Sequence, residues 1–138
     1  MIVMLDAHAL LWWWADDARL GQPARRSIAD PANAVVVSAG TIWEIAVKRA
    51  AGRLSAPANL LETVDAERFD VVAVTGGDAV AAAELPKHHR DPFDRLLIAQ
   101  AQRLDALVIT RDRAFGAYEV KVLPAERSVS HARSLPIR

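Results

Sequence analysis

Short apolar runs alternate along the chain with longer segments that carry apolar residues at helical spacing. Continuous apolar runs are typical of strands that are buried on both faces of a parallel sheet. Strands separated by helices predict an α/β sandwich, in which helices cover both faces of a mainly parallel sheet. The predicted strands are Ile2–Leu5, Ala34–Val37, Asp70–Val74, Ala106–Thr110 and a short edge strand, Val120–Leu123.

Capping residues and prolines delimit the predicted helices. Ser38 suits an N-cap, and Asp91 followed by Pro92 suits another, because the N–H that proline lacks would be unpaired at the first helical position anyway. Gly76-Gly77 is expected to break the chain before a helix capped by Asp78. The predicted helices are Ala7–Asp17, Pro23–Ala29, Ala39–Ala51, one within Leu54–Ala66, an alanine-rich helix that ends at Leu85-Pro86, and one from Pro92 through Leu104.

The 138 residues suit one compact domain, which we expect to comprise a core over 1–123 and a C-terminal tail over 124–138. Hydrophobic residues make up 52% and charged residues 25%, the composition of a globular chain. No apolar run approaches the ~20 residues that span a bilayer, so no contact with a membrane is expected. The absence of cysteine excludes a thiolate metal site and a cysteine nucleophile, and is compatible with the cytoplasmic location that we expect.

Four carboxylates fall where predicted strands end or predicted helices begin. Asp6 and Asp112 follow strands, Asp94 lies in the first turn of a helix, and Glu44 lies in the second turn of another. In a parallel α/β fold these points meet beyond the carboxyl ends of the strands. Unpaired charges beside apolar segments are costly, so a shared cation is the economical explanation. Oxygen ligands without cysteine favour Mg²⁺ or Mn²⁺, and such sites commonly serve phosphate chemistry.

Some of these acids also have an ordinary structural explanation. Asp91 taken alone is interpreted as a helix cap, as are Asp30 and Asp78. Glu44 taken alone could form an exposed pair with Lys48, which lies four residues later on the same helix. These alternatives stay open for the single residues, whereas the set of four points to a metal site.

The segments that contain the four acids resemble the PIN domain and, within it, the VapC toxins of bacterial type II toxin-antitoxin pairs. The resemblance extends from Ile2 to about Leu123, and its specificity comes from four motifs in the same order. They are MLDAHALLW at 4–12, VSAGTIWEIAVK at 37–48, HRDPFDRLLIAQA at 89–101 and VITRD at 108–112. Ala7 departs from the pattern, because the family often has threonine or serine there.

The resemblance implies a PIN-like three-layer α/β/α sandwich and a metal-dependent endoribonuclease that uses Mg²⁺ or Mn²⁺. It also implies RNA as the substrate, a cognate VapB-type antitoxin, a homodimer, and contact with DNA only through the antitoxin. The catalytic and metal-binding residues would be Asp6, Glu44, Asp94 and Asp112, supported by Thr110, Ser38 and Asp91.

The charge balance becomes informative once four acids are assigned to a metal. Seventeen basic and seventeen acidic residues cancel overall, so thirteen acids would remain against seventeen bases. Basic side chains near the acids are therefore candidates to hold RNA phosphates, which would make binding sensitive to salt. His88 and His89, in a basic loop, could contact phosphate or cap the loop, and both interpretations stay open. The candidates for phosphate contact are Lys48, Arg95, Arg111 and Arg113.

Two other classes of function compete with the nuclease. A PIN-fold protein without nuclease activity would act as a module that binds a partner or nucleic acid, and a metal titration would distinguish it. A receiver-like signalling module needs an acidic pair at the first strand end and an acceptor aspartate after the third strand. Here Asp6 stands alone and the third strand leads into Thr75-Gly76. The receiver-like alternative is therefore disfavoured.

Overall fold

The computed structural model describes residues 1–127, which form a five-stranded sheet in the order β3-β2-β1-β4-β5. Every neighbouring pair of strands is parallel, and Leu5 of the central strand lies between Val37 and Ile109. The predicted parallel sheet is therefore confirmed. The strands are β1 (Ile2–Leu5), β2 (Ala34–Ser38), β3 (Asp70–Val72), β4 (Leu107–Thr110) and β5 (Lys121–Pro124).

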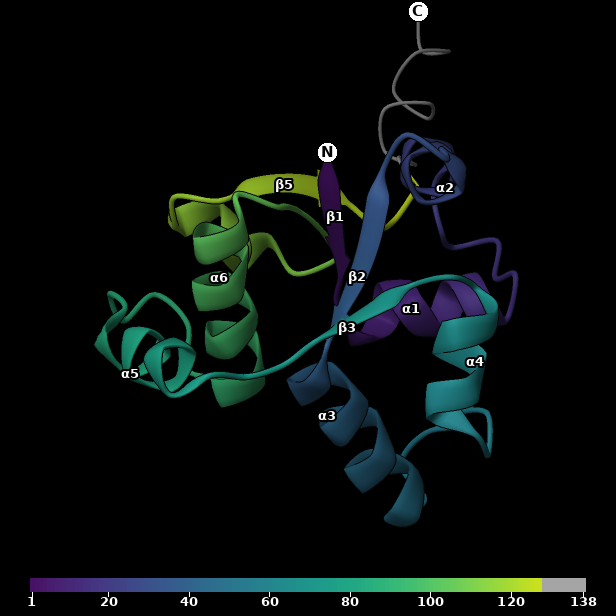
Figure 1. Ribbon diagram of the computed structural model, residues 1–138, viewed down its shortest axis with the longest axis horizontal. Coiled ribbons are helices and arrows are strands. Elements are labelled where there is room, and N and C mark those ends of the chain that lie inside the picture. Colours follow the sequence, from purple (N-terminus) through teal and green to yellow (C-terminus); the bar gives the residue numbers. More distant parts are fainter. Residues whose placement is uncertain (128–138) are drawn as a thin grey trace, which may run out of the picture.

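Helices cover both faces of the sheet, which gives the predicted three-layer α/β/α sandwich (Figure 1). In Figure 1, α1, α2 and α4 lie on one side of the strands, while α6, backed by α5, lies on the other. The helices are α1 (Ala7–Trp14), α2 (Gln22–Ala29), α3 (Ala39–Ala50), α4 (Leu60–Ala66), α5 (Gly76–Glu84) and α6 (Pro92–Leu104), and a 3₁₀ helix, η1 (Arg113–Ala117), follows β4.

Alternate side chains of β1 enter two apolar layers, one on each face of the sheet. Val3 and Leu5 pack in the layer that contains Leu10 of α1, whereas Met4 packs in the layer that contains Ile98 of α6. All five side chains are fully buried. This two-sided burial fixes the central strand, and with it the position of the residue that follows Leu5.

The start of α5 differs from the prediction. Thr75, not Asp78, is the N-cap, and the two form a capping box in which each side chain accepts the backbone N–H of the other, at 3.0 and 3.1 Å. Gly76 and Gly77 are therefore the first residues of the helix rather than a break before it. The buried Asp78 carboxylate also pairs with Arg103 of α6 at 2.7 Å, which ties α5 to α6.

Two further element ends are earlier than predicted. Helix α1 stops at Trp14, three residues before the predicted end, because Asp16 has a left-handed backbone with φ of 49°. Strand β3 stops at Val72, two residues early. No helix within residues 1–127 is long and apolar enough to cross a lipid bilayer.

The first residues of the predicted tail pack against the core. Pro124 belongs to β5, and the fully buried Ala125 accepts the backbone N–H of Gly21 at 2.8 Å. Arg127 donates its backbone N–H to Arg19 at 3.0 Å. The ordered core thus continues past the predicted boundary at residue 123. The remainder of the predicted tail, 128–138, lies outside the described residues.

Candidate metal centre

A cavity of about 390 Å³ lies at the carboxyl edge of the sheet, and all four predicted carboxylates line it. Asp6 follows β1 and Asp112 comes two residues after β4, while Glu44 and Asp94 lie in the early turns of α3 and α6. The parallel sheet sets the two strand ends side by side, and the helix starts reach the same edge. The four acids therefore line one cavity at this edge of the sheet.

Asp6 is fixed by hydrogen bonds from two neighbouring elements. Its carboxylate caps α1 by accepting the Ala9 N–H at 2.8 Å and is hydrogen-bonded by the buried Thr110 side chain. The Thr110 hydroxyl also accepts the backbone N–H of Asp112 at 3.0 Å, so one residue orients two acids. Burial is the main reason that the pKa of Asp6 is raised to about 6, and the nearby charge of Glu44 raises it further. The hydrogen bonds from Thr110 and Ala9 partly oppose this rise.

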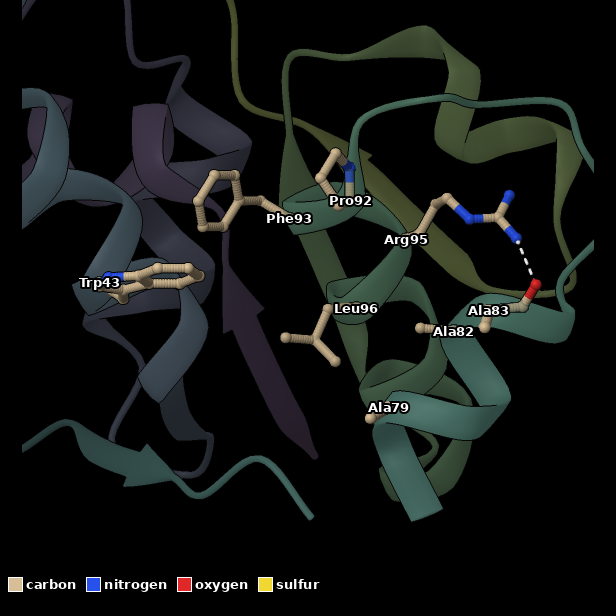
Figure 2. Close-up of a pocket in the computed structure, with 8 residues that line it drawn as sticks. All are labelled: Trp43, Ala79, Ala82, Ala83, Pro92, Phe93, Arg95 and Leu96. Atoms are coloured by element: carbon tan, nitrogen blue, oxygen red, sulfur yellow. Dashed lines mark hydrogen bonds between the residues drawn. The ribbon is translucent and has the colours of Figure 1, made fainter. Parts of the chain in front are cut away.

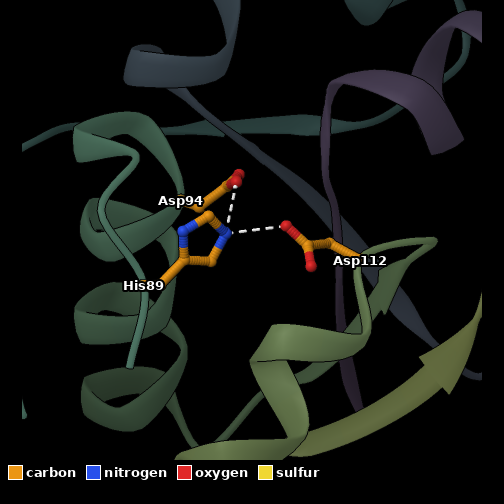
Figure 3. Close-up of side chains that lie close together, drawn as sticks. All are labelled: His89, Asp94 and Asp112. Atoms are coloured by element: carbon orange, nitrogen blue, oxygen red, sulfur yellow. Dashed lines mark hydrogen bonds and ion pairs between the residues drawn. The ribbon is translucent and has the colours of Figure 1, made fainter. Parts of the chain in front are cut away.

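His89 joins the other two aspartates. Its Nε2 lies 2.7 Å from Oδ2 of Asp112 and 3.0 Å from Oδ2 of Asp94, and Figure 3 shows the ring between the two carboxylates. Burial, followed by the charge of Asp91, raises the pKa of Asp94 to about 7. Burial also acts to raise the pKa of Asp112, but hydrogen bonds from the Ala114 N–H and from His89 outweigh it and hold the pKa below its usual value.

Glu44 is buried, with 6% of its surface exposed, and pairs with Lys48 at 2.7 Å. The pair that was the ordinary explanation for Glu44 is present, but it is not a solvated surface pair. A buried carboxylate with one cationic partner has lone pairs left for a further ligand. Glu44 thus keeps the capacity to bind a metal while Lys48 holds its side chain in place.

The donor set fits a hard divalent cation. Six carboxylates line the cavity against three lysine or arginine side chains, which leaves an excess of negative charge. Burial is the largest cause of the raised pKa values of Asp6 and Asp94, and the charges of neighbouring carboxylates raise them further. Among the described residues, the group whose ligand atoms all lie within 4.8 Å of one another is His89, Asp94 and Asp112; Asp6 and Glu44 line the same cavity but are not part of this group. Oxygen-rich groups of this kind suit Mg²⁺ or Mn²⁺.

The predicted supporting residues act in different places. Asp91 lines the cavity and caps α6, where its carboxylate accepts the N–H groups of Phe93 at 2.9 Å and of Asp94 at 3.4 Å. Ser38 is fully buried and is not among the lining residues. Its hydroxyl caps α3 by accepting the Gly40 N–H at 3.0 Å. Ser38 therefore fixes the start of the helix that carries Glu44.

Three of the four basic candidates line the cavity, namely Lys48, Arg111 and Arg113. Arg95 does not, because its guanidinium donates to backbone carbonyls between Ala83 and His89. Arg95 instead borders a separate apolar cavity of about 550 Å³ between α3, α5 and α6, where Trp43 faces Phe93 (Figure 2). It ties α6 to the loop that carries His89 and does not face the acids.

The structure adds residues that the sequence analysis did not assign to the site. The structure places the His89 ring against two carboxylates, and its Nδ1 accepts the backbone N–H of Asp91 at 3.2 Å, whereas His88 donates its backbone N–H to the Tyr118 hydroxyl at 3.1 Å. Glu126, from the predicted tail, also lines the cavity, as does His8. Burial, and then the charges of Arg111 and other cations, lower the pKa of His8. Only the position of His8 and His89 inside recognisable motifs could have indicated them.

Comparisons with known proteins find similar sequences and similar folds. The sequence profile of the PIN domain matches residues 3–121. Ribonuclease VapC22 of Mycobacterium tuberculosis is 32% identical over 114 residues, which cover 80% of this chain and 87% of that protein.

Solved structures share the fold at low sequence identity. A chain in the crystal structure of VapBC2 from Rickettsia felis bound to a DNA fragment from their promoter has a TM-score of 0.67 and 13% identity, with 90% of this chain and 98% of that chain covered. A chain in a toxin-antitoxin complex from Klebsiella pneumoniae has a TM-score of 0.61 and 18% identity, with 91% of this chain and 99% of that chain covered. These similarities concern the fold alone.

Proposed function

The chain belongs to the PIN domain family, and from this premise we propose that it is the toxin of a type II toxin-antitoxin pair, a metal-dependent endoribonuclease. The observation that carries the proposal is the convergence of Asp6, Glu44, Asp94 and Asp112 on one cavity at the carboxyl edge of the sheet. The similarity to a ribonuclease over 80% of the chain supports the same activity.

The proposed reaction is hydrolysis of an RNA phosphodiester. Water adds to phosphorus and one P–O bond breaks, so that one product ends in a phosphate and the other in a hydroxyl. When bound, Mg²⁺ or Mn²⁺ would neutralise charge on a phosphate oxygen and make the attacking water more acidic. Asp6, Glu44, Asp94 and Asp112 would supply its oxygen ligands.

The surrounding residues would orient these ligands and the substrate. Thr110 fixes Asp6 and the backbone of Asp112 through its hydroxyl, and Lys48 holds Glu44. Arg111 and Arg113 line the cavity and can neutralise the phosphates of a strand that enters it. The protein thus contributes positioning and charge, as metal-assisted phosphodiester cleavage requires.

The proposed partner is a VapB-type antitoxin, since the solved relatives include toxin-antitoxin complexes. An antitoxin arginine that reached the carboxylates would form charge-assisted hydrogen bonds with them and exclude the cation. We also infer a homodimer, and contact with DNA only through the antitoxin. Full cleavage activity in the presence of saturating cognate antitoxin would contradict this part of the proposal.

The activity is tested with the purified chain and a labelled RNA. Cleavage is expected with Mg²⁺ or Mn²⁺, not in excess EDTA, and not with Ca²⁺, which is larger and lacks a strict octahedral preference. Asp6→Asn is expected to abolish cleavage. Asp70→Asn, which alters an exposed aspartate on β3, is the matched control and should cleave normally.

Two results would count against the nuclease. Cleavage that survives excess EDTA would remove the metal from the mechanism. RNA binding without cleavage under every metal condition would favour the alternative, a PIN-fold module that only binds nucleic acid or a partner.

A further inference from the structure

A second hollow, of about 430 Å³, adjoins the carboxylate cavity and has the opposite charge. The two share Ala7, His8, Lys48 and Arg111 in their linings, so one leads into the other. Four basic side chains line the second hollow against a single carboxylate, Asp17. We call it the basic groove and define it by Arg19, Lys48, Arg53 and Arg111 together with His8 and Trp12.

Two of these cations have no hydrogen-bond or ion-pair partner in the described part of the chain. The exposed guanidiniums of Arg53 and Arg111 make no hydrogen bond or ion pair within residues 1–127, whereas Lys48 pairs with Glu44 and Arg19 with Asp17, each at 2.7 Å. Unpaired cations gathered along a concave surface raise the local concentration of anions. The groove therefore favours a ligand with several negative charges.

Trp12 holds two of the arginines in place. The guanidinium carbon of Arg19 lies 5.0 Å from the centre of the indole ring and that of Arg111 lies 6.0 Å away. The indole is only 5% exposed, so it acts as a fixed support rather than as a surface for stacking. Such cation–π contacts restrict both side chains and reduce the entropy that they lose when they bind an anion.

We propose that the basic groove holds the single-stranded RNA that flanks the cleaved bond, with Arg19, Arg53 and Arg111 contacting its phosphates. The inference rests on the proposed ribonuclease function, because a strand that enters the carboxylate cavity must continue into an adjoining space. Apolar side chains beside the cations, Leu11 and Leu54, can cover the face of a base or sugar. The volume lies in the range of small-molecule pockets, which suits individual nucleotides rather than a duplex.

The test measures how salt weakens RNA binding. The probe is a 5′-fluorescein-labelled single-stranded RNA of about twelve nucleotides. It is titrated with protein in Ca²⁺ over a series of NaCl concentrations. For single strands each phosphate contact contributes about 0.7 to the slope of log affinity against log salt. Arg53→Ala is expected to reduce the slope by about this amount and to weaken binding several-fold at low salt.

Three variants complete the design. Arg53→Lys keeps the charge and should largely preserve the slope. Arg19→Ala should lower the slope as Arg53→Ala does. Arg53 is the stricter site, because within residues 1–127 its side chain has no hydrogen-bond or ion-pair partner whose loss could disturb the fold. Arg26→Ala removes an exposed arginine of α2 that lines neither the cavity nor the groove, so it should bind as the wild type does.

The outcomes separate this inference from the proposed function. A wild type that cleaves RNA while Arg53→Ala and Arg19→Ala bind RNA with unchanged slope would overturn the groove alone. A wild type that neither binds nor cleaves RNA would overturn both. If the same variants lose binding to a polyglutamate peptide but not to RNA, the groove belongs to an acidic protein segment and the RNA proposal is wrong.

Discussion

Asp94→Asn is expected to stabilise the protein in the absence of metal. The Asp94 side chain is 18% exposed, and burial together with the charge of Asp91 raises its pKa from 3.8 to about 7. The folded chain thus holds this proton more tightly than the unfolded chain does, so the free energy of unfolding falls as pH rises from 3.8 to about 7. At about 1.4 kcal/mol per pKa unit, the ionised group costs on the order of 4 kcal/mol above this window.

Asparagine removes that charge with almost the same shape. The Asp94 carboxylate caps no helix, and its contact within residues 1–127 is with His89 at 3.0 Å, so the substitution loses little. With metal the difference narrows, because an ion that binds only the folded state adds about 2.7 kcal/mol at a hundredfold excess over its dissociation constant, which is less than the roughly 4 kcal/mol that the ionised group costs. The wild type should gain this amount, and Asp94→Asn should lose most of it.

Urea unfolding at about pH 8, in EDTA and in Mn²⁺ or Mg²⁺, measures both effects. Asp91→Ala is the comparison, since Asp91 caps α6 through the Phe93 N–H at 2.9 Å. Loss of the cap should cost ~0.5 to 2 kcal/mol in either condition. Equal stabilisation of wild type and Asp94→Asn by metal would refute the assignment of Asp94 as a ligand. A less stable Asp94→Asn in EDTA would refute the argument that burial and the charge of Asp91 make the ionised Asp94 costly.

Two further substitutions test the groups around the cavity and behind α6. Thr110→Val should lower the free energy of unfolding by ~1 to 3 kcal/mol, because it leaves the Asp112 N–H unpaired, and urea unfolding measures this loss. It should also raise the pKa of Asp6 above about 6, which NMR titration of the carboxyl group measures. Arg103→Ala should destabilise the protein by about 2 kcal/mol at neutral pH, because it leaves the buried Asp78 carboxylate without its cation. Arg103 holds the pKa of Asp78 at about 2. The loss of stability in Arg103→Ala should therefore be present above pH 3.8 and shrink as the pH falls toward about 2. Urea unfolding at neutral and at acid pH measures it.

The sheet and the helix of Asp94 were predictable because their signals are local. The apolar run Ile2–Leu5 was long enough to identify a buried strand, and the strand has the predicted bounds. Asp91 and Pro92 fixed the start of α6 because a capping carboxylate and a proline are both favoured there. Residues placed by these elements, such as Asp6 and Asp94, therefore fell at the carboxyl edge of the sheet as expected.

Arg95 shows where proximity in sequence misleads. It follows Asp94 directly, and this adjacency suggested that it faces the acids. Successive residues on an α-helix diverge by about 100°, so the two side chains leave different faces of α6. Arg95 accordingly reaches carbonyls before the helix, such as that of Leu85 at 2.9 Å. In contrast, Arg111 follows a strand end and does face the cavity.

The contacts of His89 with two carboxylates could not have been predicted from the sequence. Asp112, its partner at 2.7 Å, lies 23 residues further along the chain, beyond all of α6 and β4. The start of α5 was missed for a different reason, because the break signal of two glycines competed with the capping box of Thr75 and Asp78. Local patterns predict which elements form better than where those elements begin and end, and they do not tell which side chains meet across the fold.

The cancelling net charge conceals two regions of opposite sign that depend on each other. The carboxylate cavity is negative and would repel a phosphodiester, while the adjoining basic groove, which includes Arg53 and Arg111, would attract one. A divalent cation bound in the cavity would add two positive charges near Asp6 and Asp94, and would reduce the repulsion at the point where the strand must cross. Because linkage is reciprocal, a bound strand must in turn tighten the binding of the cation by the same factor.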